Sequence, residues 1–366
     1  MNEILDLERL KVLINEIFWE TVPSCRNIPF EGDLRKHLNI DSLDALDLAS
    51  EFHFRFDMLS ESKEQYLLQY DTAEDWLNQI YISANNPEKR FGFFSSGSTG
   101  QPTQVWHDKQ QLIEERDFWL QITKAKGVIC LVPVRHIYGF IWGLMLGTKL
   151  ERSKFLNMKD WHKTSEYSND DDLIIGHPTA WKHINLTFSH KYAVSSTAPI
   201  GKSLIEELKL DNIKGLNIYG STETGAIGYQ YWDNDYFKLL PYWQTESDKL
   251  TRDNFTFEIP DHIEWLSSST FQLNGRKDKL IQIGGENVSL IEVEANLKKI
   301  SGVKNVWVKP YHSHWGIRLF SYFQLQPEQK INTFEDKLIE HLKSLPSKLK
   351  PRKWEFSYDP FDKLNI

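Results

Sequence analysis

Apolar residues in the first 80 positions recur at intervals of three and four, a spacing typical of amphipathic helices. One stripe runs from Leu5 to Phe18, a second from Leu43 to Phe56 and a third from Ala73 to Ile80. Thr72 and Asp75 have the spacing of a capping box before the third stripe. The pattern predicts a small helical bundle over residues 1–80. The periodicity is lost in residues 81–90, YISANNPEKR, which predicts a linker.

Beyond residue 90 the pattern changes to short apolar or β-branched runs separated by Gly and Pro turns and by amphipathic stretches. Such runs predict strands, at Val128–Val132, Leu173–Ile175, Tyr192–Val194 and Leu216–Ile218. They alternate with helical stretches such as Lys202–Leu210, which predicts an α/β domain over residues 91–276. Residues 277–366 predict a small α+β domain, with helices at 291–300 and 334–345 and strands at 303–308 and 318–324.

Charge is unevenly distributed along the 366 residues, whose formal net charge is −8. Residues 1–80 hold 17 acidic and 7 basic side chains, so the rest of the chain is close to neutral. A near-neutral body without a stripe of Lys and Arg has no electrostatic footprint for nucleic acid. The most apolar stretch, 128–148, is interrupted by Arg135 and His136, so we expect a buried βα segment and no membrane span.

Cysteine content and the N-terminal residues indicate the compartment. Cys25 and Cys130 are too few for a disulfide framework, and the start MNEILDLERLK lacks the basic-then-apolar layout of a signal peptide. We therefore expect a reducing, cytoplasmic environment.

The first candidate site is Ser42, in Asp41-Ser42-Leu43 at the start of an acidic amphipathic helix. A helix N-terminus presents backbone N–H groups and a positive dipole end to an incoming phosphate. With three helices and the segment Phe30–Leu34 ahead of it, the site resembles the attachment site of acyl carrier proteins, which implies covalent 4′-phosphopantetheine on Ser42. The alternative is that Ser42 is a plain N-cap.

The second candidate site is the loop Phe93–Pro102, FFSSGSTGQP. Glycines and hydroxyls after an apolar run let backbone N–H and side-chain OH groups approach phosphate oxygens. The Gly-x4-Gly-Lys-Ser/Thr pattern of a Walker A loop is absent. The alternative is a flexible Ser/Gly linker.

A third candidate, Tyr219–Gly225 (YGSTETG), ends a predicted strand, where ligands bind in α/β sheets. A carboxylate in such a turn can hold Mg2+, which prefers oxygen ligands; an ordinary polar turn is the alternative. The fourth candidate is the segment Gly275–Gly285, preceded by Asp261. An Arg and an Asp at a domain junction suit gripping a ribose or phosphate, whereas a surface salt-bridge cluster is the alternative.

These motifs occur in the order that resembles the adenylate-forming (ANL) superfamily of acyl-CoA synthetases and related adenylation domains, from about residue 91 onward. The segment Pro133–Gly139 is similar to that family's Pro-x-x-His-x-x-Gly segment. The resemblance implies a phosphate loop made of Ser95, Ser96, Gly97, Ser98, Thr99 and Gly100. It implies ATP and Mg2+ contacts by Thr222 and Glu223, and ribose contacts by Asp261 and Arg276. It also implies a hinge at Asp278 or Lys279, an acid pocket at His136, Tyr219 and Gly220, and a pantetheine passage at Gly284 and Gly285.

The sequence departs from the family pattern in three places. Thr103 stands where a basic residue usually follows the proline of the phosphate loop. Only the predicted linker precedes that loop, so the large domain is expected to be reduced and the acid pocket incomplete. Lys363 is the candidate for the family's catalytic lysine; the alternative is that this lysine is missing, since the sequence stops at about that position.

The expected fold class is multidomain: an all-α carrier-protein bundle (1–80), a linker (81–90), a reduced α/β adenylate-forming domain (91–276) and a small α+β C-terminal mobile domain (277–366). The expected activity is ATP-dependent activation of a carboxylic acid and its transfer to a carrier thiol, in cis or in trans. Since residues 137–142 supply no carboxylate for an amino group, an aromatic or fatty acid is favoured. Expected partners are a phosphopantetheinyl transferase and enzymes that use the loaded carrier. The alternatives are a non-catalytic nucleotide-binding or carrier-docking scaffold and a transfer-only half-reaction enzyme.

Overall fold

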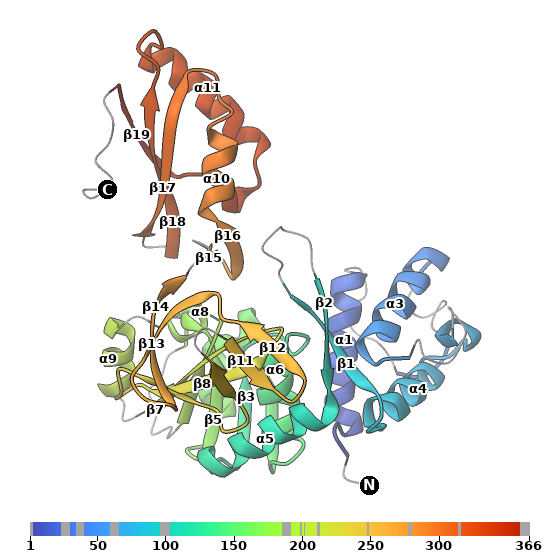
Figure 1. Cartoon of the computed structure of the whole chain (residues 1–366). Coiled ribbons are helices and arrows are strands. Elements are labelled where there is room, and N and C mark those ends of the chain that lie inside the picture. The colour runs from blue at the N-terminus through green and yellow to red at the C-terminus, as the bar shows by residue number, and fades with distance from the viewer. Residues whose placement is uncertain are drawn as a thin grey trace. The chain divides into compact units, whose positions relative to one another are not determined.

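The computed structural model of the chain (Figure 1) describes residues 3–22, 30–33, 40–58, 66–95, 103–184, 192–197, 200, 202–210, 213–246, 249–276, 280–313 and 316–358. The chain divides into two compact units, and each is described by itself. The first unit comprises residues 1–95, 103–244 and 265–271. The second unit includes residues 245–264 and 272–366.

Helices occupy the three predicted N-terminal stripes: α1 (Leu7–Thr21), α3 (Ser42–Arg55) and α4 (Ala73–Asn85), with the 3-10 turn η2 (Tyr66–Gln69) before α4. Thr72 caps α4 by accepting a hydrogen bond from the backbone N–H of Asp75, as predicted. The N-cap of α3 is Asp41, whose carboxylate accepts from the N–H groups of Leu43 and Asp44. The three helices are therefore confirmed, and the alternative that Ser42 is the N-cap is wrong, because Ser42 is the first residue inside the helix.

The N-terminal helices share a core with the hairpin of β1 (Arg90–Ser95) and β2 (Thr103–Asp108), beside which α1 and α3 lie in Figure 1. The Phe54 ring of α3 lies 4.6 Å from the Phe94 ring and 4.7 Å from the Trp106 ring. A Cβ atom on Gly92 would lie 2.8 Å from Phe54, so the backbone of β1 approaches α3 as closely as glycine permits. Helix α3 therefore buries an aromatic ring against the hairpin, and it packs with α1 through the Phe18 and Phe52 rings.

The division between the units does not fall in the predicted linker. Helix α4 continues to Asn85 and β1 begins at Arg90, which leaves only residues 86–89 between them. Residues 1–95 lie in one compact unit with the sheet that follows.

The first unit is built on a mixed sheet that contains the predicted strands. Its order is β14-β9-β8-β7-β6-β5-β3-β4, with β3 to β7 parallel and β7, β8 and β9 antiparallel. The strands are β3 (Gly127–Cys130), β4 (Arg152–Phe155), β5 (Asp172–Gly176), β6 (Tyr192–Ser195), β7 (Lys214–Ser221), β8 (Gly225–Tyr231), β9 (Phe237–Leu239) and the first residues of β14 (Thr270–Arg276). The helical elements are α5 (Lys109–Thr123), α6 (Ile137–Gly139), η3 (Phe140–Met145), η4 (Met158–Lys163), α7 (Thr164–Tyr167), α8 (Pro178–Trp181) and α9 (Lys202–Leu210).

The apolar stretch 128–148 is the buried βα segment that its pattern predicted. Strand β3 is followed by α6 and by η3, which has π-helical geometry and whose residues are all buried. Cys130 at the end of β3 is fully enclosed. No helix in the described ranges is both long and apolar enough to cross a bilayer.

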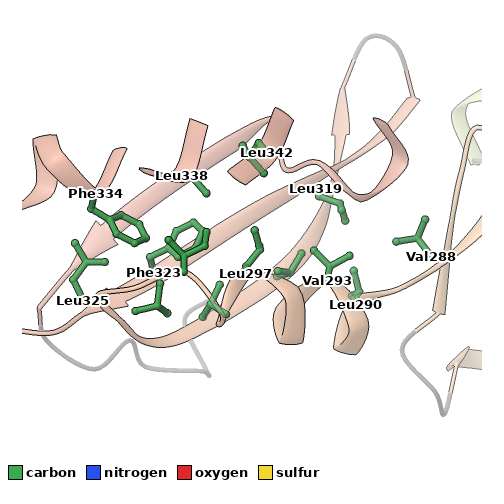
Figure 2. Packing of buried hydrophobic residues seen from close by; sticks show 14 of the residues in the cluster. Val288, Leu290, Val293, Leu297, Leu319, Phe323, Leu325, Phe334, Leu338 and Leu342 are labelled. Atoms are coloured by element: carbon green, nitrogen blue, oxygen red, sulfur yellow. The ribbon is translucent and has the colours of Figure 1, made fainter. Parts of the chain in front are cut away.

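The second unit contains the predicted C-terminal α+β elements. They are the hairpin β15 (Leu280–Ile283) and β16 (Glu286–Ser289), α10 (Leu290–Leu297), β17 (Val303–Ser313), β18 (Gly316–Leu325), α11 (Ile331–Ser344), η5 (Ser347–Leu349) and β19 (Lys353–Ser357). The unit also contains β11 (Lys249–Arg252) and β12 (Phe255–Glu258), together with β10 (Gln244–Glu246) except Gln244 and β13 (Asp261–Trp265) except Trp265. Figure 2 shows side chains of α10 and α11 packed with those of β17 and β18 around Phe323.

Replacing Phe323 by Ala should destabilise this core. The Phe323 side chain is 0% exposed and its ring contacts the Phe334 and Phe356 rings, so the change creates a cavity and costs about 3–5 kcal/mol. Thermal unfolding followed by near-UV circular dichroism measures the loss. Phe255→Ala in the same unit, where the ring is 42% exposed, is the control and should shift the transition much less. Equal shifts would contradict the packing described.

Candidate active site

The carboxyl ends of the parallel strands meet at one edge of the sheet, where ligands bind in folds of this kind. Tyr138 of α6 lies at this edge, and its hydroxyl proton is shared between the carbonyl oxygens of Gly176 (3.1 Å) and Val194 (2.8 Å). Burial raises the pKa of the Tyr138 phenol, so it remains a donor. One side chain thus fixes the ends of β5 and β6.

The predicted Tyr219–Gly225 turn connects β7 to β8 at the same edge. Within it, the backbone N–H of Ser221 donates to the Thr224 hydroxyl (3.1 Å), which in turn donates to the carbonyl of Gly225 (2.9 Å). Gly225 has φ +66°, in the left-handed region that favours glycine. The turn brings Tyr219, Gly220, Thr222 and Glu223 together, with Thr222 and Glu223 half-buried.

Two side chains from outside the motif hold this turn. Glu115 of α5 is 2% exposed and accepts hydrogen bonds from the backbone N–H of Ala226 (3.1 Å) and from the Trp119 indole (3.2 Å). A Cβ atom on residue 225 would lie 2.6 Å from the Glu115 carboxylate, a second reason for glycine there. The Nε2 atom of His107 lies 2.6 Å from the carbonyl oxygen of Thr222, so it carries the proton of that bond.

The residue that follows His136 lies beside this turn. His136 is the N-cap of α6, and the next residue, Ile137, has its Cδ1 atom 3.9 Å from the Cβ position of Gly225. His136 is exposed, yet desolvation by the surrounding protein, together with the charges of Arg135 and Arg55, lowers its pKa to about 4. The imidazole is therefore neutral at pH 7 and has one nitrogen to donate and one to accept.

Other predicted site residues lie in the second unit. Asp261 begins β13 and is half-buried, while Arg276 ends β14. Gly284 and Gly285 form the exposed turn of the β15–β16 hairpin with φ values of +63° and +88°, a geometry that glycine adopts without strain. A Cβ atom at either glycine would meet no atom within 4 Å.

Several predicted residues lie outside the described part of the chain: Ser96, Gly97, Ser98, Thr99, Gly100, Asp278, Lys279 and Lys363. Ser95 is described; it is buried at the end of β1, opposite Thr103 of β2.

Ser42, the predicted attachment residue, is exposed in the first turn of α3. Leu43 beside it is 71% exposed, and Asp44 and Asp47 follow on the same helix. The acidic helix start that the sequence predicted is thus on the surface, capped by Asp41.

Sequence reasoning missed Tyr138, His107 and Glu115. Tyr138 was inside a recognised segment, but only His136 received a role. Glu115 could have been noticed, because it lies three residues after Leu112 and four before Trp119, on the buried face of α5. His107 gave no comparable signal, since its partner is a backbone carbonyl 115 residues away.

Within the described ranges, no three His, Cys, Asp or Glu side chains gather into a metal-binding cluster. The polar side chains of the β7–β8 turn are hydroxyls and one carboxylate, all oxygen donors. Such a donor set fits Mg2+ shared with phosphate oxygens better than it fits zinc or copper.

No family model matches the chain, which is nevertheless similar to known ligases. The chain is 30% identical over 289 residues to a 4-coumarate–CoA ligase of Cereibacter sphaeroides, covering 74% of this chain and 69% of that one. It is 23% identical over 236 residues to a 3,4-dihydroxybenzoate–(aryl-carrier protein) ligase of Bacillus anthracis, covering 59% and 57%. The solved structure of the amide bond synthetase McbA from Marinactinospora thermotolerans has a similar fold, with a TM-score of 0.56 at 14% identity over 76% of this chain and 68% of that one.

Replacing Glu115 by Ala should loosen the turn. The change leaves two buried N–H donors, on Ala226 and Trp119, without their acceptor, which costs about 1–3 kcal/mol for each. Chemical denaturation measures the loss. Glu114→Ala, one residue earlier at an exposed position, is the charge-matched control and should change stability by about 0.5 kcal/mol or less. A Glu115 variant as stable as the control would contradict the assigned role.

Proposed function

The chain belongs to the adenylate-forming superfamily of ligases, and on that basis we propose that it activates an aromatic carboxylic acid with ATP and passes the acyl group to a phosphopantetheine thiol. It is an acyl- or aryl-acid adenylating ligase. The observation that carries the finer proposal is the Tyr219–Gly225 turn, held by Glu115 and His107 next to the His136 loop. This arrangement offers hydroxyls, a carboxylate and a neutral imidazole at one edge of the sheet.

The proposed chemistry has two steps. A carboxylate oxygen of the acid attacks the α-phosphorus of ATP and pyrophosphate leaves, which gives the acyl adenylate. The sulfur of the thiol then attacks the acyl carbon and AMP leaves, which gives the thioester. Because the first step gathers negative charge, catalysis depends on positioning and charge neutralisation.

The residues of the turn supply part of that neutralisation. Glu223, with the Thr222 hydroxyl, would hold Mg2+ and the phosphates, and the Ser95–Gly100 loop would surround the phosphate oxygens. His136 would orient the carboxylate of the acid, beside Tyr219 and Gly220. Bound Mg2+ would supply charge neutralisation at the phosphates.

The proposal also assigns roles to residues of the second unit. Asp261 and Arg276 would hold the ribose, Asp278 or Lys279 would act as the hinge, and Lys363 would serve as the lysine of the adenylation step. Gly284 and Gly285 would line the pantetheine passage; their lack of side chains on an exposed turn leaves room for a thin arm.

An aromatic acid is the proposed substrate class. Residues 137–145 contain no acidic side chain to pair with an amino group. Trp142 of this segment packs in the core against Trp119, with the ring centroids 4.6 Å apart. The names of the two relatives, a 4-coumarate ligase and a dihydroxybenzoate ligase, point to the same class.

For the acceptor we favour free coenzyme A. Helix α3, which begins at Ser42, is anchored at its other end by Phe54 against the β1–β2 hairpin, so it does not lie in a unit of its own. A second candidate is an arm attached to Ser42, supported by the exposed position of that serine on an acidic helix. A phosphopantetheinyl transferase and enzymes that use the loaded carrier would then be partners.

ATP–pyrophosphate exchange across a panel of hydroxycinnamic, benzoic, fatty and amino acids tests the first step. We expect an aromatic acid to give the highest kcat/KM, because residues 137–145 offer no carboxylate to an amino group and the names of the two relatives point to aromatic acids. An amino acid as best substrate would contradict the substrate class. Glu223→Ala should lower the exchange rate about a hundredfold or more, the scale for loss of charge stabilisation, while Glu206→Ala, an exposed charge-matched change on α9, should not.

Acceptor choice is tested by product analysis. With ATP, the best acid and coenzyme A, we expect the acyl-CoA thioester at the same rate in wild type and Ser42→Ala. If Ser42 carries the arm, treatment with a phosphopantetheinyl transferase will add the mass of phosphopantetheine, and ATP with the acid will then add the mass of the acyl group. Ser42→Ala will abolish both additions, whereas Ser50→Ala on the same helix will abolish neither. Thioester formation only from added acyl adenylate would indicate a transfer-only enzyme. No reaction under any of these conditions would indicate a scaffold.

A further inference from the structure

Side chains of two N-terminal helices grip the loop that precedes α6. The backbone N–H of Arg135 donates to the Glu16 carboxylate of α1 (3.0 Å), and the backbone carbonyl of Arg135 accepts from the Arg55 guanidinium of α3 (2.7 Å). The helix residues lie 119 and 80 positions away in the sequence. Glu16 is also hydrogen-bonded to the backbone of Val134. The backbone N–H and the backbone C=O of Arg135 are therefore both held by side chains from outside the loop.

The guanidinium of Arg55 is itself held on several sides. It is buried, its Nε atom donates to Glu51 (2.6 Å), and it lies over the Phe94 ring at 5.3 Å. A planar, fully oriented guanidinium loses little further freedom when it donates to a carbonyl. The Arg135 side chain pairs with Glu20 of α1, so α1 contacts both the backbone and the side chain of that residue.

We call Glu16 and Arg55, which hold Arg135 in this way, the clamp. The residue after Arg135 is His136. Because Glu16 and Arg55 fix the backbone of Arg135, they also fix the backbone position of His136, the N-cap of α6, from which its imidazole extends. The two arginines near it, Arg55 and Arg135, also oppose its protonation. The carboxylates near the clamp, Glu16, Glu20 and Glu51, each pair with the loop backbone or with one of these arginines.

We propose that Glu16 and Arg55 are positioning residues of the adenylation reaction, because they fix the position of the loop that carries His136. Helices α1 and α3 thereby take part in activating the acid. The inference rests on the proposed function, because it takes His136 as the residue that faces the carboxylate of the substrate. It gives the N-terminal helices a task in the first step of the reaction, whichever thiol accepts the acyl group.

Steady-state kinetics of Glu16→Ala and Arg55→Met test the proposal. Loss of one charge-assisted hydrogen bond should lower kcat/KM for the acid about ten- to a hundredfold, while the KM for ATP changes less than about twofold. Glu16→Gln, which keeps an acceptor oxygen, should recover most of the loss, whereas Arg55→Lys, which keeps a donor but not the planar guanidinium, should recover only part of it. Glu8→Ala, on the same helix with its side chain 80% exposed, is the matched control and should behave as wild type. Equal losses for acid and ATP, or no loss, would overturn the proposal.

A second measurement does not depend on turnover. NMR of the His136 ring should show a neutral imidazole in the wild type at pH 7, a higher His136 pKa in Arg55→Met, and a shifted ring signal in Glu16→Ala with an unchanged signal in Glu8→Ala. An unchanged His136 signal and titration in both clamp variants would overturn the inference. If none of the acids in the panel supports ATP–pyrophosphate exchange by the wild type, the proposed function fails. The His136 ring signals then still decide whether Glu16 and Arg55 position His136.

Discussion

The candidate site is made of turns and loops at the end of a sheet, and their backbone N–H and C=O groups need partners that secondary structure does not provide. Side chains supply those partners: Glu115 accepts from Ala226, His107 donates to Thr222, and Glu16 and Arg55 bind the two sides of Arg135. All four come from the first 115 residues, ahead of the strands whose ends they support. Removing any of them exposes an unpaired group in a partly buried place, so the shape of the site depends on polar contacts between distant parts of the chain.

This arrangement bears on the N-terminal helices. A carrier domain works by moving between partners, whereas α3 buries a ring and a guanidinium against the β1–β2 hairpin and the His136 loop, and α1 binds the same loop through Glu16. Ser42 remains exposed at the free end of α3. The two roles are not exclusive, because the anchored residues lie in the last turns of the helix and the serine lies in the first.

Much of the fold follows from local pattern. The alternation of β-branched runs predicted β3, β5, β6 and β7, and the helical periodicity predicted α1, α3, α4, α9 and α11, because these signals depend only on neighbours in the sequence. The Tyr219–Gly225 motif could be found for the same reason. The contacts of Glu16, Arg55 and His107 could not be predicted, since each pairs with a backbone atom far along the chain and backbone atoms leave no trace in residue identity. The merging of residues 1–95 with the sheet also depended on such long-range packing, for example at Gly92.

The enclosed position of Cys130 has a chemical consequence for an enzyme that handles activated acyl groups. Its thiol donates to the carbonyl of Val132 (3.3 Å), and burial raises the pKa of that thiol to about 12. Thiolate is the nucleophilic form of cysteine, so this side chain cannot intercept an acyl adenylate and become acylated itself. The sulfur inside the sheet is thereby kept inert, and self-inactivation by misdirected acylation at that position is avoided without a dedicated shield.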